Sequence, residues 1–77
     1  MTEDELISAL AGALEYENLN INSNIENTEV WDSLGSLTIY ATLSRITKGE
    51  SDKVKGLVTL TSIRELVAKL KEEKIIK

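Results

Sequence analysis

Cysteine and histidine are absent from this 77-residue sequence. Without them the chain lacks the common ligands of zinc and of the transition metals, and it cannot form a Ser-His-Asp or Cys-His catalytic centre. A Ser-Lys pair is the only remaining nucleophile–base combination of the usual kind. We therefore expect no metal site and no catalytic centre, so the chain is predicted not to be an enzyme.

Long apolar segments are missing as well. No stretch approaches the roughly 20 apolar residues of a membrane-spanning helix. The first five residues, Met1 to Glu5, are acidic, whereas a signal peptide begins with basic residues and continues with apolar ones. Without cysteine the chain has no disulfide that would point to an oxidising compartment. We expect one domain over residues 1–77 that is cytoplasmic and does not bind a membrane.

Positive charge is confined to one half of the chain. Residues 1–44 contain eight carboxylates and no Lys or Arg, whereas residues 45–77 contain nine basic and five acidic side chains. The acidic half would repel nucleic-acid phosphates, and the basic residues of the other half form no run, so we expect no nucleic-acid binding. An acidic surface instead suits a protein partner with a basic docking face.

Apolar residues at helical spacing predict three main helices. The first runs from about Glu3 to about Glu15 and starts with a Thr2–Glu5 pair typical of a capping box. The second starts at Asp32 or Ser33, and both residue types cap helices well.

The second helix is expected to end at about Thr47 or Lys48, where Gly49 provides a stop. The third helix follows a second capping-box pattern, formed by Ser62 and Glu65.

The segments between these helices are less regular. Residues 17–30 contain five Asn, which favour turns, together with four aliphatic side chains that predict a loop lying across the core: Leu19, Ile21, Ile25 and Val30. Residues 50–53 are predicted to form a polar turn, and residues 53–60 a short helix or an ordered turn. The fold class is therefore an all-α bundle of three to four helices with a long first loop.

The second helix has apolar residues on two faces. At about 100° per residue, Ala41 lies roughly 20° and Leu37 roughly 60° from Leu34, whereas Ile39 and its neighbours Leu43 and Ile46 lie at about 120–180°. We expect the second group and part of Tyr40 to face the core. Leu34, Leu37 and Ala41 would then form an exposed apolar patch of the kind that contacts partners. The alternative is that Leu34 and Leu37 pack under the Asn-rich loop.

An Asp-Ser pair lies where this helix is predicted to begin, within the motif Trp31-Asp32-Ser33-Leu34-Gly35. Most such pairs are simply helix caps. Here, however, the motif and its context resemble the attachment site of acyl carrier proteins, and the resemblance covers the whole chain. That family folds as a helical bundle with a long first loop, a short third helix and the modified serine at the start of helix two.

The resemblance implies a function and assigns roles to residues. Ser33 would carry 4'-phosphopantetheine, transferred from coenzyme A by a phosphopantetheinyl transferase, and Asp32 would lie beside the metal and coenzyme A during that transfer. Leu34, Leu37 and Ala41 match positions at which the family contacts its partners. The chain would be a monomer that presents an acyl or aminoacyl thioester to loading and processing enzymes of fatty-acid, polyketide or other specialised biosynthesis.

The helix departs from the family pattern in its charge. Helix two of fatty-acid carriers is acidic along its exposed side, whereas here it has neutral residues followed by Arg45 and Lys48. Acidic docking would have to use Glu26, Glu29 and Asp32, which precede the helix. This difference favours a dedicated set of partners. Trp31 could pack over the loop or belong to the docking surface, and Ser36 is the rival acceptor serine.

Two other functions compete with the carrier hypothesis. The chain could be an unmodified helical protein–protein interaction module in which Ser33 serves only as a cap. It could also be a small regulator that dimerises through Leu34, Leu37 and Tyr40.

Overall fold

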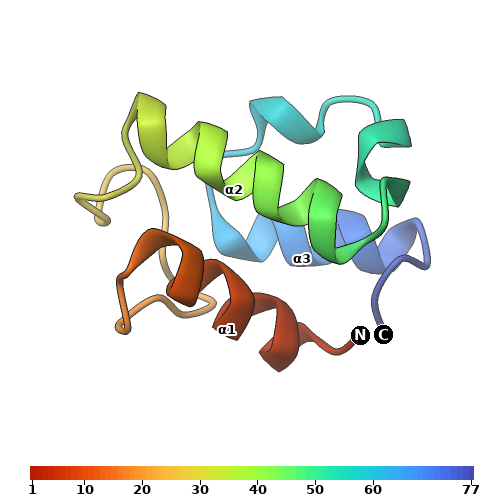
Figure 1. Cartoon of the computed structure of the whole chain (residues 1–77), viewed down its shortest axis with the longest axis horizontal. Coiled ribbons are helices and arrows are strands. Elements are labelled where there is room, and N and C mark those ends of the chain that lie inside the picture. The colour runs from red at the N-terminus through yellow and green to blue at the C-terminus, as the bar shows by residue number, and fades with distance from the viewer.

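The computed structural model describes residues 1–77 and contains three α-helices and two short 3-10 helices (Figure 1). The elements, in chain order, are α1 (Glu3–Leu14), α2 (Ser33–Ile46), η1 (Glu50–Lys53), η2 (Leu57–Thr59) and α3 (Ile63–Glu72). The α1 and α2 helices run antiparallel side by side, and α3 lies behind them (Figure 1). The predicted all-α fold is confirmed, with three α-helices rather than four.

The helices begin where the sequence predicts because polar side chains satisfy their free amides. The Thr2 hydroxyl accepts a hydrogen bond from the Glu5 amide at 3.3 Å, and the Glu5 carboxylate accepts one from the Thr2 amide at 2.9 Å. This is the predicted capping box. At α3 the Ser62 hydroxyl caps the Glu65 amide, but the Glu65 side chain bonds to that hydroxyl and not to the Ser62 amide. The second capping box therefore forms only in part.

Thirteen buried apolar side chains form one core. They come from all three helices, from the long loop, from both 3-10 segments or their ends, and from the tail after α3: Leu6, Leu10, Leu19, Trp31, Ile39, Leu43, Val54, Leu57, Ile63, Leu66, Val67, Leu70 and Ile76. Ile46 and Tyr40 are partly buried against this core. The face of α2 that was expected to pack inward does so.

The loop between α1 and α2 is held by hydrogen bonds as well as by packing. Asn20 and Asn24 accept hydrogen bonds from the amides of residues two or three positions further on, at 2.8–2.9 Å. A single antiparallel bridge joins Asn24 to Ser62, just before α3. Leu19 is buried and Ile21 packs on the core, but Ile25 is 45% exposed, so the prediction that Ile25 anchors the loop is wrong.

The segment that follows α2 forms short 3-10 helices. The predicted turn at residues 50–53 is η1, and the second apolar stretch is η2, which begins after Gly56 with φ of 78°. Leu57 is buried while Val58 remains on the surface. None of the helices has the length and apolarity needed to cross a membrane.

Candidate attachment and docking site

The end of the long loop is fixed immediately before α2. Trp31 is only 2% exposed and belongs to the core, so of its two interpretations the packing one is correct. Its amide donates a hydrogen bond to the Thr28 carbonyl at 2.9 Å. The Val30 carbonyl lies so close to Gly35 that a β-carbon at position 35 would approach its oxygen to 1.9 Å. Gly35 is thus required by this close backbone contact.

Asp32 caps the helix. One carboxylate oxygen, Oδ1, accepts a hydrogen bond from the Gly35 amide at 2.8 Å, and the Asp32 carbonyl accepts one from the Ser36 amide at 2.8 Å. These two bonds begin the hydrogen-bonding pattern of α2. The side chain is exposed, so its second oxygen remains open to solvent. The structural role of Asp32 therefore leaves one oxygen free for another partner.

Ser33 is the first residue of α2 and is exposed. Its hydroxyl makes no hydrogen bond within the chain, and the amides of Ser33 and Leu34 find no acceptor there. Free amides at a helix N-terminus, together with the positive end of the helix dipole, favour a negatively charged group. A phosphate ester on the Ser33 oxygen would therefore lie in a favourable field.

Ser36, the rival acceptor, is less accessible. It is half-buried, and it lies about 200° from Leu34 around the helix, toward the side that faces the core. Ser33 instead lies on the solvent side, about 100° from Leu34. The two hydroxyls of the first turn therefore differ in exposure, and Ser33 is the accessible one.

The outward face of α2 is apolar at its start. Leu34 is 73% exposed and Leu37 is 65% exposed, and Ala41 is also on the surface. Neither leucine packs under the Asn-rich loop, so that alternative is wrong. Ser33 consequently adjoins two exposed leucines on a rigid helix.

Val58, on η2, is another exposed aliphatic side chain, and the sequence did not single it out. It is 68% exposed. The Tyr40 hydroxyl donates to the Val58 carbonyl at 2.8 Å, which holds η2 against α2. The only sequence signal was a β-branched residue in a segment too short to have a clear buried face. Burial raises the pKa of the Tyr40 hydroxyl.

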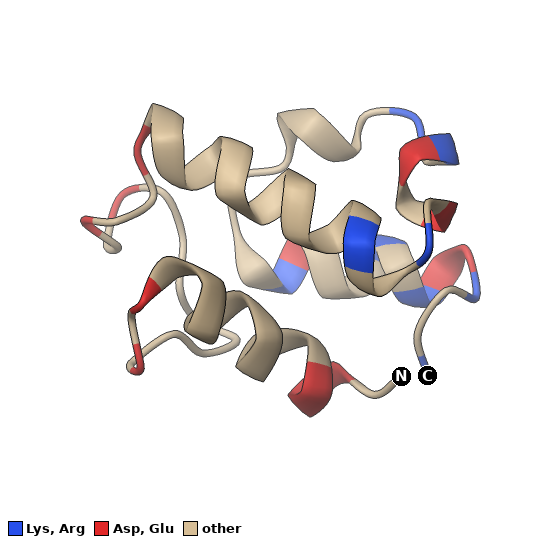
Figure 2. Ribbon diagram, viewed as in Figure 1, with Lys and Arg blue, Asp and Glu red and all other residues tan.

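Carboxylates gather at the same end of the bundle as Ser33. Figure 2 shows the acidic loop and the C-terminal end of α1 beside the start of α2, with the basic residues toward the opposite end. The exposed carboxylates there are Glu15, Glu17, Glu26, Glu29 and Asp32. No Lys or Arg occurs before residue 45, but Arg64 reaches the loop and donates a hydrogen bond to the Asn22 side chain at 2.7 Å, so this end is mainly acidic. Such a surface favours a basic partner.

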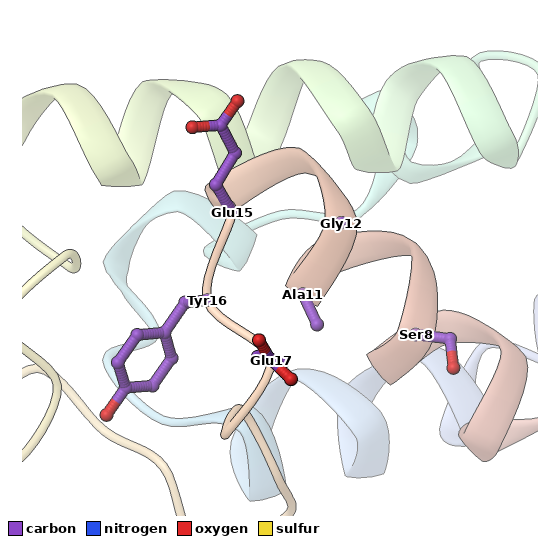
Figure 3. A pocket seen from close by; sticks show the side chains of 6 residues that line it. All are labelled: Ser8, Ala11, Gly12, Glu15, Tyr16 and Glu17. Atoms are coloured by element: carbon purple, nitrogen blue, oxygen red, sulfur yellow. The ribbon is translucent and has the colours of Figure 1, made fainter.

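The protein surface has several hollows. One, of about 530 Å³, is lined by Ser8, Ala11, Gly12, Glu15, Tyr16 and Glu17 on α1 and the residues that follow it (Figure 3). In Figure 3 the Glu15 and Tyr16 side chains point away from one another, so they form no joint polar site. No group of three His, Cys, Asp or Glu side chains is placed to hold a metal ion.

Comparison with protein-family models, with curated proteins and with solved structures finds no match to this chain.

Proposed function

We propose that this chain is an acyl carrier protein whose Ser33 carries 4'-phosphopantetheine. The observation that supports this proposal most directly is the exposed hydroxyl of Ser33 at the start of α2, which makes no hydrogen bond within the chain. Asp32, just before it, caps the helix by accepting a hydrogen bond from the Gly35 amide. The motif around it resembles the attachment site of that family. The chain itself performs no catalysis in this proposal.

The residues present suit the attached group. When bound, the phosphopantetheine arm would supply a thiol that holds an acyl or aminoacyl group as a thioester. The free amides of Ser33 and Leu34 would stabilise the negative phosphodiester, and the helix dipole adds to this effect. Asp32 would keep the helix end in place through Oδ1, while its exposed second oxygen faces the incoming coenzyme A and its metal.

The surroundings of Ser33 suit docking of partner enzymes. Leu34, Leu37 and Ala41 would contact apolar side chains of a partner, and Glu29 would meet basic ones. The phosphopantetheinyl transferase and the acyl-loading and acyl-processing enzymes are the proposed partners. The neutral and basic second half of α2 favours dedicated partners over those of ordinary fatty-acid synthesis.

The test is incubation with a phosphopantetheinyl transferase and coenzyme A, followed by measurement of the intact mass. We expect the mass to increase by one phosphopantetheine in the wild type and in Ser36→Ala, and to stay unchanged in Ser33→Ala. Ser36→Ala is the matched control because it removes a neighbouring hydroxyl from the same helical turn. A mass increase that persists in Ser33→Ala would contradict the assignment.

An unmodified interaction module is the second candidate function. It is favoured by the two exposed leucines, because they could bind a partner without any modification of Ser33. In that case Ser33→Ala would leave partner binding unchanged while Leu37→Glu abolished it, and no transferase would increase the mass.

A further inference from the structure

We propose that two copies of this chain associate reversibly through their α2 helices, packed antiparallel. The association concerns the outward face of α2, and it does not depend on modification of Ser33. Four residues define this face, which we call the α2 seam: Leu34, Leu37, Ala41 and Ser44.

The α2 seam has the spacing of a helix–helix contact. Its residues follow one another at intervals of three, four and three, which is the a/d pattern by which two helices pack. Leu34 and Leu37 are 73% and 65% exposed, and Ala41 is exposed as well. Ser44 is half-buried, and its hydroxyl donates to the Asp52 carboxylate at 3.0 Å. Nothing in the chain covers the two leucines.

Side-chain size along the α2 seam favours an antiparallel pair. The large residues, Leu34 and Leu37, lie in the first half of the helix, and the small ones, Ala41 and Ser44, lie in the second half. With a two-fold axis at the level of Ile39, Leu37 of one copy lies opposite Ala41 of the other, and Leu34 lies opposite Ser44. One register thus places both leucines over small residues, as good packing requires. A parallel pair would oppose leucine to leucine and leave space beside the small residues.

The charges at the ends of α2 fit the same register. Glu29 and Asp32 precede the helix, whereas Arg45 and Lys48 lie at its end (Figure 2). Around that two-fold axis, Asp32 of one copy lies opposite the residues between Arg45 and Lys48 of the second copy. Glu29 of the first copy lies opposite Lys48 of the second.

Within the chain these charges are available for such contacts. The two ion pairs present join Lys69 to Glu72 and Lys71 to Glu3, so neither Arg45 nor Lys48 is paired. Antiparallel packing therefore opposes unlike charges, whereas parallel packing would oppose like ones.

The area available limits the strength of this association. One helix face of 14 residues is about 21 Å long, which yields an interface below the size of stable complexes. We therefore expect a weak dimer that forms at high protein concentration and dissociates on dilution. Salt would screen the attraction between the opposite charges at the two ends of the pair, so the dimer should also weaken as the salt concentration rises.

The dimer would have a consequence for Ser33, and this consequence rests on the proposed function. Ser33 adjoins Leu34, so the second copy would cover the attachment site and part of the docking face. Unmodified chains would then protect one another from non-productive contacts, and only the monomer would be modified. The rate of modification per chain would fall as the concentration of chain rises.

Sedimentation velocity over about 20 µM to about 1 mM tests the association itself. We expect the weight-average sedimentation coefficient of the wild type to rise with concentration, and Leu37→Glu to remain monomeric. Val58→Glu is the matched control, because Val58 is equally exposed but lies on η2 outside the α2 seam, and it should associate as the wild type does. A wild type that is monomeric throughout, or an unaffected Leu37→Glu, would overturn the proposal.

Charge reversal tests the antiparallel geometry. Glu29→Lys and Lys48→Glu should each be monomeric alone, since each opposes like charges at both ends of the pair. Mixed in equal amounts, the two variants should form a heterodimer, because every opposed pair is then complementary. Association of either variant alone would refute the antiparallel register, because in a parallel pair each substitution only exchanges one like-charged contact for another. Failure of the mixture to associate would refute it as well. Neither result depends on whether a transferase modifies Ser33, so the two proposals can fail separately.

Discussion

Gly35 and Ser33 lie two positions apart on α2 and have opposite surroundings. Ser33 faces solvent with a free hydroxyl, whereas Gly35 is buried against the Val30 carbonyl. The sequence identified Ser33 through its neighbours in the motif. It could not show the role of Gly35, because that role depends on where the loop carbonyl lies. The same limit explains Trp31, whose burial follows from the path of the whole loop.

Gly35→Ala should destabilise the protein. A methyl group at this position would lie 1.9 Å from the Val30 oxygen, so the loop end or the first turn of α2 must move. We expect a loss of about 1–3 kcal/mol in the free energy of unfolding, as for overpacked sites, measured by urea denaturation. Gly12→Ala is the control: no atom lies within 4 Å of its added methyl, and alanine in a helix should stabilise by about 0.5–1 kcal/mol. Equal effects at both positions would contradict the account.

The boundaries of the three helices and the positions of the short segments after α2 could be predicted from the sequence, whereas the packing of the long loop could be predicted only in part. Capping residues and apolar periodicity are local signals, and the observed ends of α1 and α2 lie within one or two residues of the expected ones. The exposure of Ile25 depends on tertiary contacts, so no local signal predicts it. For the candidate site, exposure of Leu34 and Leu37 followed from helical geometry, but the exposure of Val58 did not.

The capping box of α1 should make the free energy of unfolding of the protein depend on pH. Hydrogen bonds from the Thr2 backbone and then its side chain hold the pKa of the Glu5 carboxyl below its ordinary value of 4.5. Because the pKa is lowered in the folded chain, this contribution is present above pH 4.5 and is lost as the pH falls through the folded-state pKa. Glu5→Gln keeps an acceptor oxygen that does not titrate. Its stability deficit relative to the wild type should therefore shrink in acid, measured by urea denaturation, and a deficit that grew in acid would contradict this.

The contact between α2 and η2 depends on one hydroxyl. Tyr40 donates to the Val58 carbonyl at 2.8 Å, with the Leu60 carbonyl at 3.3 Å. Tyr40→Phe should lower the free energy of unfolding by about 1 kcal/mol, because phenylalanine cannot donate the neutral hydrogen bond to the Val58 carbonyl. Tyr16→Phe is the control, because the Tyr16 hydroxyl makes no hydrogen bond within the chain, and we expect a change within about 0.5 kcal/mol.

Across the whole molecule, the leucines divide into a buried set and an exposed set. Leu10 is fully buried in the core, whereas Leu34 is 73% exposed on the outward face of α2. The separation of charge follows the same arrangement, because antiparallel α1 and α2 bring the acidic loop and the start of α2 to one end. The sequence predicted the uneven charge, but only the packing of the helices places these carboxylates beside Ser33.

Leu10→Ala and Leu34→Ala should differ strongly in thermal and urea unfolding. We expect Leu10→Ala to cost about 2–5 kcal/mol through lost burial and a residual cavity. Leu34→Ala should change stability by no more than about 0.5 kcal/mol, because the side chain is exposed and alanine favours a helix. Under the proposed function, Leu34→Ala should instead weaken contacts with partner enzymes. A large loss of stability in Leu34→Ala would show that this leucine packs on the core after all.

The most direct test of the central claim is to locate the modification within the chain. After incubation with a phosphopantetheinyl transferase and coenzyme A, the protein is digested and its peptides are fragmented in a tandem mass spectrometer. We expect a single phosphopantetheine on Ser33, with Ser36 unmodified in the same peptide. A chain that remains unmodified, or one modified at another residue, would contradict it.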